Sequence, residues 1–405
     1  MTLVREKPQP AEPKKNVAEF NSSRRVLALD GLRGIAIVAV FLFDYGSGGN
    51  QSSIASVRAV SKVLGLGWTG VTLFFVLSGF LITGILYDTR ADAGYYQKFY
   101  ARRILRIFPI YYLAAAVIFV VGISLGVHWR AGHLSFLFFC GFPAALIWPS
   151  LIQLPQAIHF THVWSLSVEE QFYAAWPWLM RWMRKKRNIL LACLVMFVAA
   201  LALRMAFVQW VNPVWAYTFL PCRMDALAVG AALAIAVRAW GARALNRWAI
   251  AIFVLSSAAF VLLCVIRRTV DHNDAAVAVW GHSLVALSCG GLLVMSLGPL
   301  SGLFSWSLLR MFGRYSYGLY LYTMPLESLL EPLKPRIMAR VGSFAAGSVL
   351  YVAVCLAIDL SVAVLSYHFI EAPIMRWKSR FRYARVPDKE SQNKATDSVT
   401  VPNGY

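Results

Sequence analysis

The first long apolar stretch of the chain, residues 26–45, contains two charged residues, Arg33 and Asp44. In an α-helix, eleven residues at 100° each return to within about 20° of the starting direction, so both side chains share one face, roughly 16 Å apart. A charge inside a membrane span costs at least about 2.5–3.5 kcal/mol unless it faces protein or water, and it marks function by default. This face is therefore expected to line a reaction or transport cavity. The alternative is that each charge pairs with another helix and only stabilises the bundle.

A second group of polar residues stands where a later span begins. It comprises His162, Trp164, Ser165, Ser167, Glu169, Glu170, Gln171 and Tyr173. Helical spacing places Ser165, Glu169 and Tyr173 on one face, because each is four residues from the next. Carboxylates and hydroxyls on one face are the groups that general acid–base chemistry requires.

Two further segments contain residues that suggest function. Ser78 and Gly79 lie inside an apolar run, where small residues allow close helix approach or a helix break. Arg102 and Arg103 lie four and three residues before Arg106, a geometry that could bind phosphates. The arginine run alone is equally consistent with a topology anchor on the cytoplasmic side.

The composition is that of a membrane protein. Of 405 residues, 59% are hydrophobic and only 14% are charged, against roughly 25% charged in soluble proteins. The net charge of +20 does not indicate nucleic acid, because the basic residues bracket the apolar runs. The six cysteines occur singly, with no spacing typical of a metal site, so no metal is expected.

With a span length of about 20 residues, the sequence predicts an all-α, polytopic membrane helix bundle of about ten transmembrane helices. These are expected to begin near residues 26, 65, 107, 165, 189, 223, 249, 275, 308 and 343. Lys and Arg before the first span, between the second and third, and after the fourth predict that both termini are cytoplasmic. Residues 1–24 and 379–405 are predicted to be disordered tails, and the apolar segment 134–147 to be re-entrant or interfacial.

Seven blocks in chain order resemble those of the acyltransferase 3 family of integral membrane acyltransferases. They are residues 29–34, 74–80, 103–106, 164–173, 223–227, 316–321 and 369–373, which read LDGLRG, FFVLSGF, RILR, WSLSVEEQFY, RMDAL, SYGLYL and FIEAP. The resemblance covers residues 25–378 and implies a ten-helix transmembrane domain. It also implies transfer of an acyl group, usually acetyl, from cytoplasmic acyl-CoA to a hydroxyl of a carbohydrate or exported glycan.

The resemblance implies a multi-pass protein of the bacterial inner (cytoplasmic) membrane. Its partners are expected to be acyl-CoA, a carbohydrate or glycan acceptor and membrane lipid, but no nucleic acid. Acyl-CoA is a donor substrate in this interpretation, and no permanently bound cofactor is expected.

The matching blocks supply the candidate site residues. Catalytic roles are expected for Arg33, Asp44 and Glu169, and donor-phosphate binding for Arg103 and Arg106. The other candidates for substrate binding are Ser78, Trp164, Glu170, Tyr173, Arg223, Asp225, Tyr317 and Tyr320. The oxyanion formed during acyl transfer is expected to be stabilised by one of three of these residues, Arg33, Ser78 or Tyr317.

Two positions depart from the family pattern. An arginine followed eleven residues later by a histidine, the proposed base, is usual in the first span, and here the second position is Asp44. A later block often carries histidine where this chain has Thr323. One hypothesis is that Asp44 is the base, with Glu169 assisting or orienting. The alternatives are a different base or donor, a catalytically degenerate member that binds acyl-CoA or glycan, and a transporter.

Overall fold

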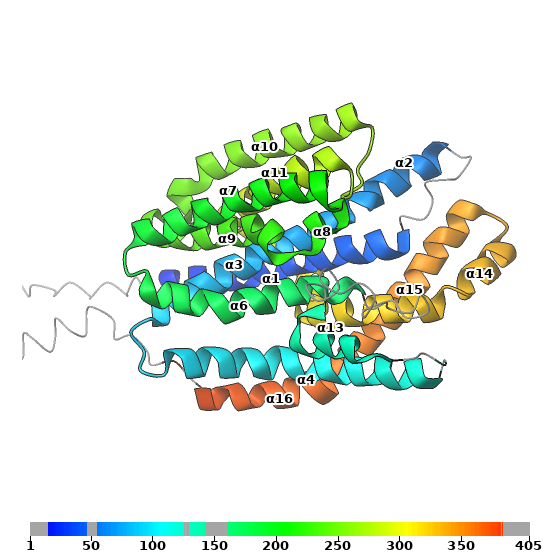
Figure 1. Ribbon diagram of the computed structural model, residues 1–405, viewed down its shortest axis with the longest axis horizontal. Helices are drawn as coiled ribbons and strands as arrows, with labels where there is room; N and C mark the ends of the chain where they lie inside the picture. The colour runs from blue at the N-terminus through cyan, green and yellow to red at the C-terminus, as the bar shows by residue number, and fades with distance from the viewer. Residues whose placement is uncertain are drawn as a thin grey trace, which may run out of the picture.

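The computed structural model describes residues 15–46, 55–124, 126, 129–141, 161–381 and 383. Every regular element within these ranges is a helix, which confirms the all-α prediction. The long helices lie side by side in one elongated bundle (Figure 1). Most of the two predicted tails and part of the segment 134–147 lie outside the described residues, whereas α1 (Lys15–Gly46) begins within the first predicted tail.

Seven helical segments of the described chain are long and apolar enough to cross a membrane. They are Ala55–Thr89, Tyr95–Ser124, Lys186–Trp210, Pro213–Trp240, Ala242–Arg267, Val277–Ser296 and Phe344–Phe381. The other long helices are α1, α6 (Trp164–Trp182) and α13 (Ser307–Leu330), which carry many of the polar residues singled out above. The chain is therefore a multi-pass membrane protein, while the count of ten spans and the cytoplasmic termini stay predictions.

The bundle has a central group of helices flanked on two sides. In Figure 1, α7 (Lys186–Trp210), α10 (Ala242–Arg267) and α11 (His282–Ser296) lie on one side, and α4 (Tyr95–Ser124) lies on the other. Between them run α1, α3 (Thr69–Thr89), α6, α9 (Leu220–Trp240) and α13. The last long helix, α15 (Phe344–Ser366), packs against α13. Buried apolar side chains of the central helices form one large core. A second, smaller cluster joins Phe41 and Tyr45 of α1 to Leu330 of α13 and to Tyr351 and Cys355 of α15.

The shorter helices connect the long ones or follow α15. They are α2 (Ala55–Leu64), η2 (Gly65–Trp68), η3 (Ala131–Phe138), η4 (Thr161–Val163), α8 (Pro213–Thr218), η5 (Val277–Gly281), α12 (Ser301–Phe304), α14 (Leu333–Val341), η6 (Tyr367–Glu371), α16 (Ala372–Arg376) and η7 (Trp377–Phe381). The helix expected near residue 107 begins earlier, at Tyr95, because the turn before it is closed locally. There the backbone N–H of Gly94 donates to the Asp92 carboxylate at 2.8 Å.

Glycines allow the central helices to pack closely. A Cβ atom at Gly79 of α3 would collide with the backbone carbonyl of Leu227 in α9. A Cβ atom at Gly34 of α1 would collide in the same way with Leu309 of α13. Small residues at helix contacts permit such short separations in membranes. The close approach predicted from Gly79 is thus confirmed, and it positions Ser78 and Arg33, the residues next to these glycines.

Candidate functional site

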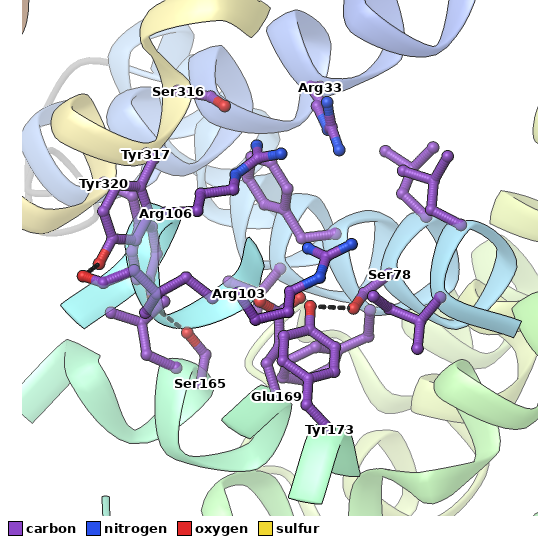
Figure 2. Close-up of a pocket in the computed structure, with 18 residues that line it drawn as sticks. Arg33, Ser78, Arg103, Arg106, Ser165, Glu169, Tyr173, Ser316, Tyr317 and Tyr320 are labelled. Carbon is purple, nitrogen blue, oxygen red and sulfur yellow. Dashed lines mark hydrogen bonds between the residues drawn. The ribbon is translucent and has the colours of Figure 1, made fainter. Parts of the chain in front are cut away.

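A cavity of about 100 Å³ lies where α1, α3, α4, α6 and α13 meet (Figure 2). Eight of the thirteen predicted site residues line it: Arg33, Ser78, Arg103, Arg106, Glu169, Tyr173, Tyr317 and Tyr320. Ser165 and Ser316 are further polar residues of the lining, and the remainder is apolar. Residues from five helices, far apart in the sequence, therefore surround one small space.

Three arginines form the basic end of the cavity. Arg103 and Arg106 share one face of α4 because they are three residues apart. Arg33 of α1 donates a hydrogen bond to Asp30 at 3.1 Å. Within the described chain, Arg33 is the one arginine of these three that forms an ion pair with a carboxylate. The charge of Arg103 and Arg106 thus remains available for an anionic ligand.

The face of α6 predicted from helical spacing is directed into the cavity. Ser165, Glu169 and Tyr173 all line it. The hydroxyls of Tyr173 and Ser78 are 2.5 Å apart and hydrogen-bonded. Glu169 lies beside both hydroxyls and interacts electrostatically with Arg103 (Figure 2). The lining therefore places a carboxylate able to accept a proton next to groups able to donate one.

Two tyrosines of α13 line the cavity beyond this carboxylate. The hydroxyl of Tyr320 donates to the backbone carbonyl of His162 at 2.7 Å and lies 2.5 Å from the Ser165 hydroxyl. Since the single proton of Tyr320 goes to His162, Ser165 is the donor of the second hydrogen bond. Tyr317 donates to the backbone carbonyl of Ile107 at 2.8 Å, which connects α13 to α4. Tyr317 would have to release this partner before it could stabilise an oxyanion.

Asp44 lies outside the cavity lining. Its side chain interacts electrostatically with Tyr320, Tyr217 and two further carboxylates, Glu327 and Asp359. Neither Glu327 nor Asp359 was predicted as a site residue, although a charge in an apolar helix is the signal that identified Arg33. The described residues hold no group of three or more His, Cys, Asp or Glu side chains arranged to bind a metal ion. Arg33 and Asp44 of one helix thus have different surroundings.

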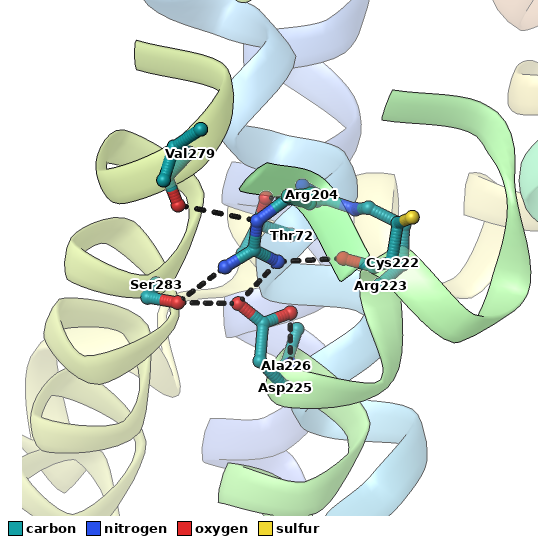
Figure 3. Close-up of polar contacts among 8 residues, drawn as sticks. All are labelled: Thr72, Arg204, Cys222, Arg223, Asp225, Ala226, Val279 and Ser283. Atoms are coloured by element: carbon teal, nitrogen blue, oxygen red, sulfur yellow. Dashed lines mark hydrogen bonds and ion pairs between the residues drawn. The ribbon is translucent and has the colours of Figure 1, made fainter. Parts of the chain in front are cut away.

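Arg223 and Asp225 lie in a buried polar network instead of the cavity (Figure 3). Asp225 forms an ion pair with Arg204 at 2.8 Å, and both side chains are 0% exposed. Ser283 donates to the same carboxylate oxygen at 2.8 Å. Arg223 donates to the Thr72 hydroxyl at 2.7 Å. Arg204 was not predicted from the sequence, and its pairing with Asp225 matches the structural alternative in which a charge holds helices together.

The Arg204–Asp225 pair yields a stability prediction. We expect Arg204→Met to destabilise the protein by about 3–5 kcal/mol, because Asp225 is left buried without its cation. The double variant Arg204→Met/Asp225→Leu should recover part of this loss. Thermal unfolding in detergent, followed by tryptophan fluorescence, measures the effect.

A matched control is Arg267→Met. This variant breaks the ion pair of Arg267 with Asp274, in which the arginine side chain is 46% exposed, so its effect on the unfolding temperature should be much smaller than that of Arg204→Met. If Arg204→Met/Asp225→Leu is as unstable as Arg204→Met alone, the instability does not come from an unpaired buried Asp225, and the interpretation is contradicted.

Trp164 and Glu170, the remaining candidates, also lie outside the lining. The ring of Trp164 packs against Tyr217 and Phe75, with centroids 4.6 and 6.0 Å apart. Because Phe75 lines the cavity, Trp164 supports its wall from behind. One carboxylate oxygen of Glu170 is buried and has no hydrogen-bond partner within the described chain. Substrate binding by these two residues stays a prediction.

Comparison with known proteins identifies relatives over most of the chain. Residues 26–360 match a family model described as an acyltransferase domain. The putative peptidoglycan O-acetyltransferase YrhL of Bacillus subtilis strain 168 is 28% identical over 384 residues, which cover 87% of this chain and 55% of YrhL. The peptidoglycan O-acetyltransferase OatA of Listeria monocytogenes is 25% identical over 384 residues, covering 88% of this chain and 56% of that protein.

A third relative is the O-acetyltransferase OatA of Staphylococcus aureus strain MRSA252. It is 24% identical over 416 residues, which cover 96% of this chain and 63% of that protein. The chain thus spans between 55% and 63% of the length of these three relatives. No solved structure shows significant similarity to it.

Proposed function

This chain belongs to the acyltransferase 3 family, and we propose that it is a membrane-bound O-acyltransferase that moves an acetyl group from cytoplasmic acyl-CoA to a hydroxyl of an exported glycan. The relatives are O-acetyltransferases by name, and two are named for peptidoglycan. These names support acetyl as the transferred group and a glycan as its acceptor. The cavity in which arginine, carboxylate and hydroxyl side chains meet is the observation that carries the proposal.

The basic end of the cavity is the proposed donor site. The excess of Lys and Arg before the first span, between the second and third spans and after the fourth supports a cytoplasmic position for this end. In a bacterial inner membrane, acyl-CoA is available on that side. Arg103 and Arg106 would bind the coenzyme A phosphates, because guanidinium groups form strong paired hydrogen bonds with phosphate oxygens. The thioester arm would then extend between the helices toward Glu169.

The proposed reaction is direct acyl transfer. Glu169 removes the proton of the acceptor hydroxyl as its oxygen attacks the thioester carbonyl. The carbon–sulfur bond breaks, and the coenzyme A thiolate leaves and takes up the proton from the carboxyl group. Arg33, which points into the cavity (Figure 2), stabilises the negative oxygen, a contribution of about 2.7–4 kcal/mol for a typical donor. Asp44 is the second candidate base and approaches the cavity through Tyr320.

Removing the two α4 arginines should weaken donor binding. We expect Arg103→Ala/Arg106→Ala to raise the Kd for acetyl-CoA by roughly 10²–10⁴-fold, because each lost charge-assisted hydrogen bond is worth about 1.5–3 kcal/mol. Calorimetry on the purified protein measures this. Arg187→Ala, which removes an exposed arginine of α7, is the control. Unchanged acetyl-CoA binding in the double variant would contradict the assignment of the donor site to Arg103 and Arg106.

Mass spectrometry of exported glycans from cells with and without the gene tests the function itself. The proposal predicts glycans that carry an acetyl group only when the gene is present. A catalytically degenerate member, an alternative that Asp44 in place of histidine favours, would bind acyl-CoA or glycan and yield no acetylated product. A transporter would move its substrate across the membrane without forming any covalent product.

A further inference from the structure

Beyond the residues that the family model matches, the chain continues into a segment that contains the block at residues 369–373 and packs along α4. The matched region ends at residue 360, whereas η6, α16 and η7 extend the chain through residues 367–381, which we call the C-terminal strap. In Figure 1, α16 lies alongside α4. Arg102 of α4 fixes the end of the strap, because its Nη1 donates to the Phe381 carbonyl at 3.2 Å. Its guanidinium also lies 5.3 Å from the centre of the Tyr383 ring.

The strap brings a lysine to the basic end of the cavity. Lys378 of η7 is half-buried, and its strongest electrostatic neighbours are Arg106, Arg103 and Arg102. The neighbouring carboxylate is Glu371, also of the strap, which interacts with Arg106 and Lys378. Four cations and one strap carboxylate therefore gather at the contact between the strap and α4.

This cluster of four cations and one carboxylate is suited to bind a multiply charged anion. Like charges at short range repel one another, and their repulsion grows as the surroundings become less polar. A ligand that carries several phosphate charges would offset this repulsion and gain a charge-assisted hydrogen bond from each cation. Coenzyme A carries both a diphosphate and a separate 3′-phosphate.

The position of each cation indicates which phosphate it would bind. Arg103 and Arg106 line the cavity, whereas Lys378 does not. The strap ends beside the first turns of α4 (Figure 1), where Arg102 donates to the Phe381 carbonyl. Lys378 precedes this end by three residues and lies outside the cavity that Glu169 lines. In coenzyme A the diphosphate is linked to the thioester arm, and the 3′-phosphate lies at the opposite, nucleotide end. The cation outside the cavity thus corresponds to the phosphate farthest from the thioester.

We propose that Lys378 binds the 3′-phosphate of coenzyme A and makes the C-terminal strap part of the donor site. This inference rests on the proposed function, because it takes acyl-CoA as the donor. The phosphate of an anionic lipid headgroup would offer the same chemistry to Lys378. The experiment therefore has to separate the two sources of phosphate.

The test compares acetyl-CoA with 3′-dephospho-acetyl-CoA on the full-length protein in phosphatidylcholine nanodiscs. Wild type should bind acetyl-CoA at least tenfold more tightly than the dephospho compound. Lys378→Gln should weaken acetyl-CoA binding about tenfold or more and leave binding of the dephospho compound unchanged. Lys378→Arg should retain the preference. The matched control is Arg376→Gln, which changes an exposed cation of the same strap and should alter neither affinity.

Each other outcome overturns the inference in a distinguishable way. Equal weakening of both compounds by Lys378→Gln would make Lys378 a structural residue of the strap. A second outcome is that Lys378→Gln leaves both affinities unchanged but alters how acetyl-CoA binding responds to added phosphatidylglycerol. This outcome would assign the lysine to a lipid headgroup. If wild type prefers acetyl-CoA to the dephospho compound and Lys378→Gln keeps that preference, this inference is refuted while the proposed function stands. Wild type that binds neither compound would refute the donor assignment of the proposed function as well.

Discussion

Glu169→Gln is expected to lower the rate of acetyl transfer by about 10²–10⁴-fold, the usual contribution of a positioned acid–base group. The substitution preserves the shape of the side chain and removes its ability to accept a proton. Glu169 is the one carboxylate in the described lining of the cavity. The rate is measured on purified protein with acetyl-CoA and a panel of glycan oligosaccharides.

Two further measurements make this result specific. Binding of acetyl-CoA should persist in Glu169→Gln, which would locate the defect in the chemical step and not in donor binding. Glu331→Gln, which changes an exposed carboxylate at the end of α13, should retain the wild-type rate. An undiminished rate in Glu169→Gln would show that Glu169 is structural.

If Asp44 is the base and Glu169 only assists or orients, Asp44→Asn is expected to reduce transfer by a similar factor, about 10²–10⁴-fold, and Asp44→His to retain it or improve it. In the resemblance to the family, Asp44 stands where a histidine is usual, and it interacts with Tyr320, which lines the cavity. An asparagine keeps the size of the side chain but cannot act as a base, whereas a histidine can. Rates are compared in one membrane preparation at matched expression, with Asp88→Asn, a 54% exposed carboxylate, as control.

The alternative of a lost base makes a different prediction for the same variants. Wild type and Asp44→Asn would then be equally inactive, and Asp44→His, alone or with Thr323→His, would restore activity. Robust transfer by Asp44→Asn would leave Glu169 as the base and end the catalytic assignment of Asp44.

Local spacing was sufficient to predict much of the fold and part of the site. The helical segments follow from the length of their apolar runs, which depends on neighbouring residues alone. Ser165, Glu169 and Tyr173 could be placed together because residues four apart in a helix always share a face. The pairing of Arg103 with Arg106 on one face follows from the same periodicity.

Contacts between helices could not be predicted in this way, because they depend on how the helices cross. Arg204 and Asp225 are 21 residues apart, and Tyr45 and Asp359 are 314 residues apart, yet each pair meets through side chains of different helices. One helix face meets different neighbours along its length. This explains why Asp44 lies outside the cavity although Arg33, on the same face, lines it. The packing of the C-terminal strap against α4, which brings Lys378 to the arginines, is likewise set by tertiary structure and by no local pattern.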